Sequence, residues 1–187
     1  MFNSFCLKRD MVFSSITFLF YFLPGVLLLY WLVGRTRRNL LLLLASLLFY
    51  AWGEGIYLLL MFASISINYI MGRVIHAYRS TSYGRVFLIL AVVLNLSILG
   101  YYKYGHFFTE NMNYFLGLFQ LPLINLTPIR LPIGISFFTF QALSYVIDVY
   151  RQKNEPQKNF VNLGLYISLF PQLIAGPIVR YNDIAKQ

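Results

Sequence analysis

The sequence has very few of the residues that a soluble protein turns toward water. Of its 187 residues only 11% are charged, six are acidic, and the single cysteine, Cys6, has nothing to pair with. A soluble domain carries about 25% charged residues, and small secreted modules carry several paired cysteines. The shortage of charge therefore excludes an ordinary soluble domain, and the lone cysteine excludes a disulfide-stabilised secreted module.

Apolar and aromatic side chains are in excess instead, at 59% and 19% of the chain, which excludes a disordered protein. The formal charge is nevertheless +9, because 15 lysines and arginines outnumber the six acids. In a soluble protein that excess would suggest nucleic acid as a partner. Here the basic residues sit in short clusters between long apolar runs, which is typical of membrane proteins with several spans. We therefore predict a lipid bilayer as the partner, and no nucleic acid.

Six apolar runs alternate with polar segments, and about 20 apolar residues suffice to cross the hydrocarbon core of a bilayer. We predict about six membrane-spanning helices, one for each run: Val12–Val33, Leu40–Trp52, Ile56–Ile75, Val86–Tyr104, Leu131–Tyr150 and Phe160–Val179. The segment Gly105–Arg130 mixes polar residues with phenylalanines, so it is predicted to form an interfacial or partly re-entrant amphipathic helix followed by an irregular loop. The expected fold class is an all-α integral membrane protein in which some helices are broken or kinked.

Three basic clusters indicate how the helices are oriented in the membrane. They hold nine of the 15 basic residues: Arg35, Arg37, Arg38, Arg73, Arg79, Arg85, Arg151, Lys153 and Lys158. With six spans all three clusters fall on one side, which the positive-inside rule makes cytoplasmic, and the N-terminus then lies outside. Residues 1–11 are interpreted as an unstructured leader, with Met11 as an alternative start, residues 12–180 as the transmembrane part, and residues 181–187 as a truncated end.

The fifth predicted span carries polar side chains that a lipid-facing helix would not need. Their spacing of i, i+3, i+4 and i+7 places them on one face of a helix. They are Gln141, Ser144, Tyr145 and Asp148. Polar groups at membrane depth are costly and usually face a cavity or another helix. Two interpretations stay open: the four line a substrate passage, or they bond to a neighbouring helix, with Asp148 at the cytoplasmic interface near Arg151.

The sixth predicted span contains residues that break helices. Pro171 removes a backbone hydrogen bond, and Gly176 and Pro177 interrupt the helix a second time. The freed backbone groups cannot face lipid, so this stretch is expected to be buried in protein or to line a water-filled cavity. Arg180, just beyond it, is interpreted either as a cation that holds an anionic group in the same passage or as an interfacial anchor.

Other parts of the chain offer few candidates for chemistry. Neither of the two histidines, His76 and His106, has a carboxylate or serine placed beside it by the sequence, so no catalytic role is expected of them. Ser64, Asn68 and Gly72 are small or polar at i, i+4 and i+8, which favours close helix packing. The sequence contains no zinc-ligand spacing, phosphate-binding loop or nucleophile elbow, and we predict no metal site.

Five stretches of the sequence carry a resemblance to a known enzyme family. They are MVFSSITFLFYFLPGVLLLYW, LLLLASLLFYAWGEGIYLLLMFASISINYIMG, NLSILGYYKYGHFF, LPIGISFFTFQALSYVIDVYR and NLGLYISLFPQLIAGPIVRYNDI. They resemble the N-terminal part of a membrane-bound O-acyltransferase, most closely the members that O-acetylate alginate. The likeness covers nearly all of the chain from Met11 on.

The resemblance implies a multi-span enzyme, shaped as a helical funnel around a catalytic histidine, that transfers an acyl group to a hydroxyl of an extracytoplasmic acceptor. It implies acetyl-CoA as the donor with no bound cofactor, an exported polysaccharide such as alginate as the acceptor, and other proteins of an O-acetylation complex as partners. It also implies the bacterial cytoplasmic (inner) membrane as the location. The family's histidine lies beyond the last residue of this chain, so we expect a fragment without a catalytic residue that is inactive alone.

Several alternatives stay open. Members of the same family that transfer D-alanine to teichoic acid, or acetyl groups to peptidoglycan or cellulose, remain possible. Broken helices with polar residues at membrane depth also suit a transporter or channel subunit, although the paired short segments of such folds are not found. A non-catalytic membrane scaffold is a further alternative, because the expected truncation removes the catalytic residue.

Overall fold

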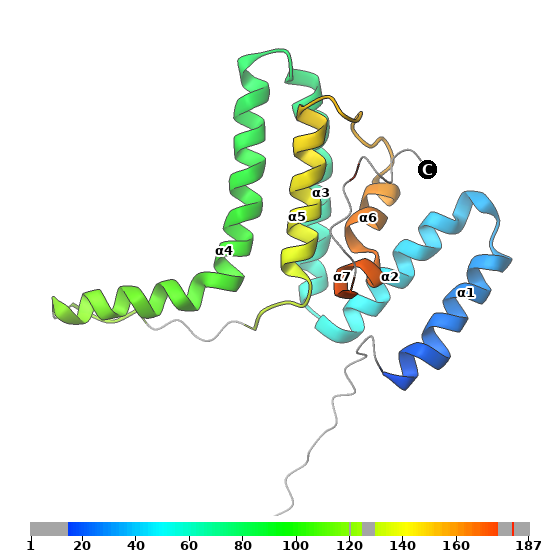
Figure 1. Cartoon of the computed structure of the whole chain (residues 1–187), viewed down its shortest axis with the longest axis horizontal. Coiled ribbons are helices and arrows are strands. Elements are labelled where there is room, and N and C mark those ends of the chain that lie inside the picture. The colour runs from blue at the N-terminus through cyan, green and yellow to red at the C-terminus, as the bar shows by residue number, and fades with distance from the viewer. Residues whose placement is uncertain (1–14, 120, 125–129, 176–180, 182–187) are drawn as a thin grey trace, which may run out of the picture.

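The computed structural model describes residues 15–119, 121–124, 130–175 and 181, and every regular element in that part of the chain is a helix (Figure 1). In chain order these are η1 (Phe18–Phe22), α1 (Leu23–Leu32), η2 (Arg35–Arg37), α2 (Arg38–Glu54), α3 (Tyr57–Tyr78), α4 (Ser82–Leu118), α5 (Ile135–Tyr150), α6 (Phe160–Ser168) and α7 (Phe170–Ala175). The predicted all-α class is confirmed. Helices α3 and α4 are long and apolar enough to cross a membrane, whereas the count of six spans stays a prediction.

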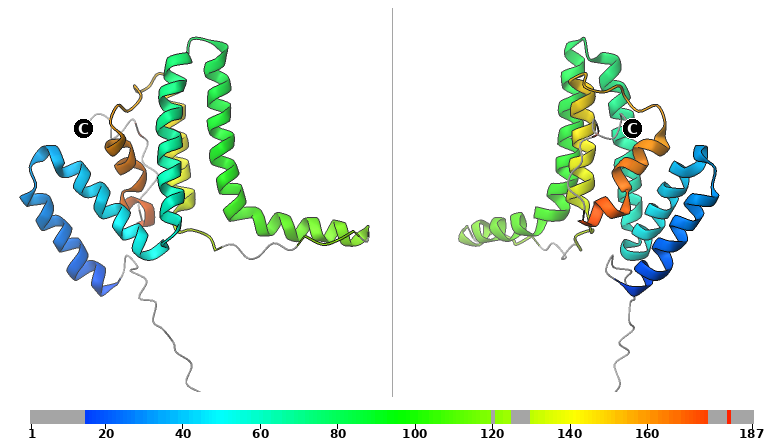
Figure 2. Two further views of the ribbon diagram at one scale, coloured as in Figure 1. Left: turned by 180° about the vertical axis from the view of Figure 1, so that it is seen from behind. Right: turned by 45° about the vertical axis from the view of Figure 1, so that its right-hand side comes forward.

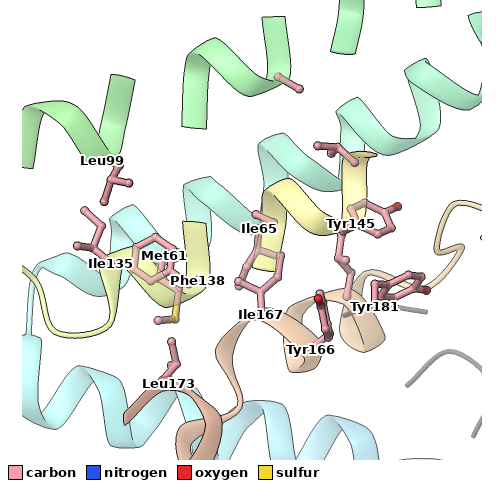
Figure 3. Packing of buried hydrophobic residues seen from close by; sticks show 14 of the residues in the cluster. Met61, Ile65, Leu99, Ile135, Phe138, Tyr145, Tyr166, Ile167, Leu173 and Tyr181 are labelled. Carbon is pink, nitrogen blue, oxygen red and sulfur yellow. The ribbon is translucent and has the colours of Figure 1, made fainter. Parts of the chain in front are cut away.

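Helices α3, α4 and α5 form the centre of the molecule, and each of them packs against the other two (Figure 1, Figure 2). Helix α6 contacts α2, α3 and α5, and α1 lies outermost against α2. Apolar side chains from α3, α5, α6 and α7 meet in one core (Figure 3). Its fully enclosed members include Met61, Ile65, Ile135, Phe138 and Ile167.

Large apolar side chains also cover the outside of these helices. Leu59, Phe62 and Ile70 on α3, and Ile89 and Val93 on α4, are all exposed. Apolar surface of this extent is unfavourable in water, and it suits contact with lipid. The exposed side chains therefore agree with the composition in indicating a membrane protein.

The first apolar run forms a helix with a distorted beginning. Pro24 has no N–H to donate, and just before it the backbone closes wider π-type turns, in which the N–H of Leu23 donates to the carbonyl of Phe18. Four phenylalanine rings, with centroids 5.2–5.7 Å apart, hold this beginning against α2 and α7. They are Phe18, Phe22, Phe49 and Phe170.

The predicted end of the fourth helix at Tyr104 is wrong. The helix continues to Leu118, so most of the segment predicted as a separate interfacial helix, Gly105–Arg130, belongs to the same element. Figure 1 shows α4 bending in its lower part, so that its distal portion points away from the other helices. We call residues 105–118 the arm.

The helix persists there because nothing in the sequence stops it before Pro122. Polar side chains in the arm bond to their own helix: Thr109 Oγ1 donates to the carbonyl of Gly105 (2.9 Å), and Asn111 Nδ2 to that of Phe107 (2.7 Å). The helix ends shortly before the proline, whose preceding residue is disfavoured in the helical region. The polar and aromatic residues after Tyr104 therefore accompany a bend in α4 and not the end of the helix.

The last two runs are shorter helices than predicted. Helix α5 begins at Ile135 and not at Leu131, because Gly134 adopts φ +76°, a left-handed conformation that helices do not continue through. The sixth run is broken at Leu169, which separates α6 from α7 with a ψ of 113°. The prediction that Pro171 kinks a helix is therefore wrong. Pro171 lies in the first turn of α7, where its missing N–H costs nothing.

The three basic clusters lie toward the same end of the helices. In Figure 1 the α1–α2, α3–α4 and α5–α6 connections are in the upper half of the picture, and the α2–α3 connection and the arm are in the lower half. We call the upper end, which carries the three clusters, the basic end. This arrangement is the one that the six-span prediction requires, although the side of the membrane stays a prediction.

Candidate functional site

The polar face predicted on α5 is turned into the bundle. Gln141 is 1% exposed, Tyr145 is fully buried and Asp148 is 7% exposed, while Ser144 is only half-buried. Helix α5 is able to bury this face because α3, α4 and α6 all contact it. The spacing argument therefore located a real buried face, and the neighbours of each side chain decide what that face does.

Tyr145 serves packing near the basic end. Its hydroxyl accepts a hydrogen bond from the backbone N–H of Gln157 (3.1 Å), and its ring packs edge-on against Tyr181 with centroids 5.0 Å apart (Figure 3). The Gln157 side chain donates to the Tyr181 hydroxyl (3.0 Å), and burial raises the pKa of that phenol. A Cβ added to Gly72 of α3 would lie 2.5 Å from the Tyr145 hydroxyl, so no open space adjoins the ring there.

Gln141 and Asp148 differ from Tyr145 because each has an unsatisfied polar atom. Gln141 Oε1 and Asp148 Oδ2 are buried without a hydrogen-bond partner in the part of the chain that the structure describes. Leaving such an atom unpaired costs about 1–3 kcal/mol, so native proteins usually provide it with a water, a ligand or another residue. Of the four predicted residues on α5, these two are the best suited to meet a substrate or a water-filled passage.

Helix α2 carries a second buried polar face that the sequence analysis missed. Ser46, Tyr50 and Glu54 are all buried at i, i+4 and i+8. The Ser46 hydroxyl accepts the backbone N–H of Phe170 (3.4 Å), one of the groups freed where α6 breaks from α7. The Tyr50 hydroxyl and both Glu54 carboxylate oxygens have no hydrogen-bond partner among the described residues. The signal was available in the sequence, as single polar residues repeating every four positions in a leucine-rich run.

Glu54 lies at the end of α2 away from the basic clusters, with an arginine nearby. Its side chain is 2% exposed and lies 4.0 Å (Oε1) from Nη2 of Arg130, whose side chain is 52% exposed. An enclosed carboxylate is strongly disfavoured without a positive partner, so Arg130 supplies the compensating charge from the segment that precedes α5.

The break between α6 and α7 adjoins the polar face of α2. Helix α7 contacts α2, and Leu173 of α7 sits against Gly134, just before α5 begins. Gln172, beside Leu173, adds a buried amide nitrogen that has no partner in the described part of the chain. Irregular backbone and unpaired polar atoms of α2 and α7 thus occur in two helices that contact each other, a combination that favours a hydroxyl-bearing ligand or water.

The remaining predicted passage residues divide into two groups. Pro171 is exposed in the first turn of α7, so it faces away from the break. Gly176, Pro177 and Arg180 lie outside the residues that the structure describes, and their assignment to a passage stays a prediction.

Neither histidine has the setting of a general base. His76 Nδ1 lies 3.2 Å from Nη1 of Arg79, and no carboxylate is paired with it in the described part of the chain. His106 lies in the arm, 3.4 Å from Glu110, and both side chains are more than half exposed. A base must reach its substrate's proton within a protected site, which an exposed pair on the arm does not provide.

The packing interpretation of Ser64, Asn68 and Gly72 agrees with the structure. All three residues are buried. Asn68 and Asn95 of α4 exchange two side-chain hydrogen bonds of 3.0 and 2.9 Å, and each amide also donates to a carbonyl of its own helix. The two asparagines thus satisfy each other's hydrogen-bonding groups, which lipid cannot do.

Comparison with known proteins gives relatives over nearly the whole chain. The chain is 46% identical over 179 residues to a protein of Pseudomonas aeruginosa, and 45% identical to one of Pseudomonas putida, both named "Probable alginate O-acetylase AlgI". It is 34% identical over 206 aligned residues to a protein of Helicobacter pylori named "Peptidoglycan O-acetyltransferase". Each alignment includes 95% of this chain.

The same alignments include only 34–38% of the relatives, so the chain spans about a third of the length of the curated proteins it matches. No protein-family model matches the chain, and no solved structure matches it significantly. The resemblance inferred from the five sequence stretches is confirmed.

Proposed function

We propose that the chain is part of a membrane-bound O-acetyltransferase that adds acetyl groups to hydroxyls of an exported polysaccharide. The observation that carries this proposal is the identity of 41–46%, over about 95% of the chain, with five proteins that share the name alginate O-acetylase. Alginate is accordingly the acceptor we favour. The Helicobacter pylori relative, at 34% identity, supports peptidoglycan as the second candidate.

The proposed reaction requires an acetyl group to cross the membrane. In our proposal acetyl-CoA is the donor at the cytoplasmic face, the acceptor lies outside, and six spans hold the passage in the inner membrane with the N-terminus outside. The grouping of the three basic clusters at one end supports that orientation. Other proteins of an O-acetylation complex would present or export the polymer.

The described residues would form part of the passage wall and not its catalytic centre. Gln141 and Asp148 on α5, and Tyr50 and Glu54 on α2, offer unpaired hydrogen-bonding atoms to that wall, and Ser46 of α2 binds the backbone at the α6–α7 break. Gly176, Pro177 and Arg180 would extend that wall, because the sequence predicts a second helix break there with a cation beside it. Because neither His76 nor His106 is placed as a base, we propose that acetyl transfer needs a residue outside those described, and that this chain alone is inactive.

The test is made at the chromosomal locus that encodes the chain. Deleting the locus should remove ester-bound acetate from an exported polysaccharide, and restoring it should return the acetate. Replacing Gln141 with leucine at the locus should lower the acetate content several-fold at an unchanged amount of membrane protein, because the amide would no longer meet the substrate or its water. Exposed Leu90→Ala on α4 is the control and should change little.

The measurements are ester-bound acetate per sugar residue and the amount of the protein in isolated membranes. Unchanged acetate in every exported polymer after deletion would overturn the proposed function. Normal acetate in the Gln141→Leu strain at normal protein level would overturn the passage role alone. Loss of acetate from peptidoglycan and not from alginate would identify the second candidate acceptor.

A further inference from the structure

The turn between α3 and α4, at the basic end, encloses a polar cavity of about 290 Å³. Its lining comes from the turn itself and from the last residue of α5: Arg79, Thr81, Ser82, Arg85 and Tyr150. The two guanidinium groups, the Ser82 hydroxyl and the Tyr150 phenol are able to donate hydrogen bonds to a ligand, whereas the Thr81 hydroxyl already donates to the carbonyl of Tyr78. The composition of the wall favours an anion with several oxygen atoms.

The two arginines have no acidic partner in the described part of the chain. No carboxylate there lies within 4.0 Å of Arg79 or Arg85. Arg79 Nη1 lies 3.2 Å from Nδ1 of His76. Because no acidic side chain lines the cavity, the two arginines leave a net positive charge facing it.

The backbone around the cavity adds to this potential. Helix α4 begins at Ser82 without a side-chain cap, because the Thr81 hydroxyl donates to the carbonyl of Tyr78 (2.7 Å) instead. The N–H of Gly84 donates to the carbonyl of Thr81 (3.1 Å), while the start of α4, at the positive end of the helix dipole, has no side-chain cap. Gly84 keeps the turn tight, since a Cβ there would lie 2.5 Å from the Tyr78 carbonyl oxygen.

The surroundings of the cavity match the boundary between lipid and water. Tyr78 and Tyr83 are exposed beside it, and Val86 and Ile89 present exposed apolar side chains along the next turns of α4. Tyrosines gather at the headgroup level of membranes, with apolar side chains below them. A ligand in the cavity would therefore carry its charge at the headgroup level, with any acyl chains lying along α4.

We propose that this cavity binds a phosphate group, supplied by the headgroup of an anionic phospholipid. Arginine guanidinium groups match phosphate oxygens in pairs, and basic pockets at the cytoplasmic ends of membrane helices are suited to anionic headgroups. The proposal rests on the membrane placement of α3 and α4, and it does not depend on acetyl transfer. The phosphates of an acyl donor carry the same chemistry, so the experiment separates the two sources.

The test uses the full chain, purified in neutral detergent, and native mass spectrometry to count bound phosphatidylglycerol during titration. Arg79→Ala/Arg85→Ala should weaken binding at least about tenfold, the equivalent of one charged hydrogen bond. The matched control, Arg35→Ala/Arg37→Ala, removes the same charge from the α1–α2 turn and should change binding less than about twofold. Phosphatidylcholine should bind more weakly than phosphatidylglycerol.

A second variant covers the case in which the double substitution disturbs folding. Ser82→Asp places a negative charge at the start of α4, where it stabilises the helix and repels phosphate. It should lower phosphatidylglycerol binding while the melting temperature is unchanged or raised. Equal binding by the wild-type chain, the Arg79/Arg85 variant and the Ser82→Asp variant would overturn the proposal. Displacement of the lipid by coenzyme A, but not by inorganic phosphate at equal concentration, would overturn the lipid as the source.

Discussion

At the scale of single residues, the fit between α3 and α5 depends on Gly72. The Tyr145 ring occupies the space where a side chain at Gly72 would begin, and that ring is itself held by Gln157 and Tyr181. A larger residue would have to move a rigid, enclosed ring and not the end of a flexible side chain. The glycine is thus explained by a close approach of two helices and needs no role in chemistry.

We expect Gly72→Ala to destabilise the chain by about 1–3 kcal/mol, because overpacking forces side chains and backbone to shift. The control is Gly100→Ala on α4, where a Cβ meets nothing within 4 Å and a gain in helix propensity should leave stability unchanged or raised. Both variants are compared by thermal unfolding in the same detergent. Equal melting temperatures for Gly72→Ala and the wild-type chain would show that the Tyr145 ring can move aside without loss of stability.

The Asn68–Asn95 pair provides a second test at this scale. Side-chain hydrogen bonds between membrane helices contribute about 0.6 kcal/mol on average and up to about 1.7 kcal/mol. Because two bonds join this pair, we expect a double-mutant cycle of Asn68→Ala and Asn95→Ala to give a coupling energy of about 1 kcal/mol or more. Asn111→Ala is the control, since that side chain bonds only within its own helix. A coupling energy of zero would show that the Asn68–Asn95 pair does not stabilise the packing of α3 against α4.

At the scale of elements, the arm of α4 is connected to the segment that follows it by the Asn113 side chain and by a backbone bond from the N–H of Leu121 to the carbonyl of Leu116 (2.9 Å). Asn113 Nδ2 donates to the carbonyl of Ile124 (2.9 Å), and the N–H of Ile124 donates back to Asn113 Oδ1 (2.8 Å). These two bonds fold residues 121–124 back along the arm. The segment between α4 and α5 is therefore organised at its beginning, despite three prolines in its sequence.

Replacing Asn113 with leucine should release residues 121–124 without unfolding the helix. We expect the amide hydrogen of Ile124 to exchange with solvent roughly tenfold faster, which corresponds to losing about 1.4 kcal/mol of protection. The control is Asn111→Leu, which makes the same substitution about half a helical turn away and should leave the exchange rate of the Ile124 amide unaltered. Hydrogen exchange read by mass spectrometry distinguishes the two, and equal rates in both variants would show that the segment is held by other contacts.

How far the sequence predicts these elements depends on the kind of signal. Long apolar runs located all the helices, and the four-residue spacing on α5 located a buried polar face. The boundary at Tyr104 was wrong because tyrosines and polar residues indicate a membrane surface, and a helix can bend there as well as end. The polar face of α2 was missed because each of its polar residues stands alone among apolar or glycine neighbours. At the break after α6, the N–H of Phe170 is bound by Ser46, a contact distant in sequence that no local pattern contains.

At the scale of the whole molecule, the distribution of basic residues predicts which loops face the cytoplasm. In a Cys6→Ser background, single cysteines at Thr36, Thr81 and Asn154 should be labelled by an impermeant thiol reagent only after the cells are opened. A cysteine at Leu123, beside the arm, should be labelled in intact cells. The expected result follows from the positive-inside rule and from the shared end of the three basic clusters. Opposite labelling of Thr36 and Asn154 would exclude the six-span arrangement.

The reciprocal asparagine pair also bears on how the chain is made. In the part of the chain that the structure describes, α3 and α4 are the helices both long and apolar enough to cross a membrane, and they leave the ribosome before α5. Because Asn68 and Asn95 satisfy each other, this hairpin has no need of a later helix to shield its amides from lipid. Helix α5, with its unpaired polar atoms, is synthesised afterwards. It enters a membrane that already contains α3 and α4, against which it packs. The order of the elements along the chain thus lets the self-sufficient pair be inserted first and the dependent helix second.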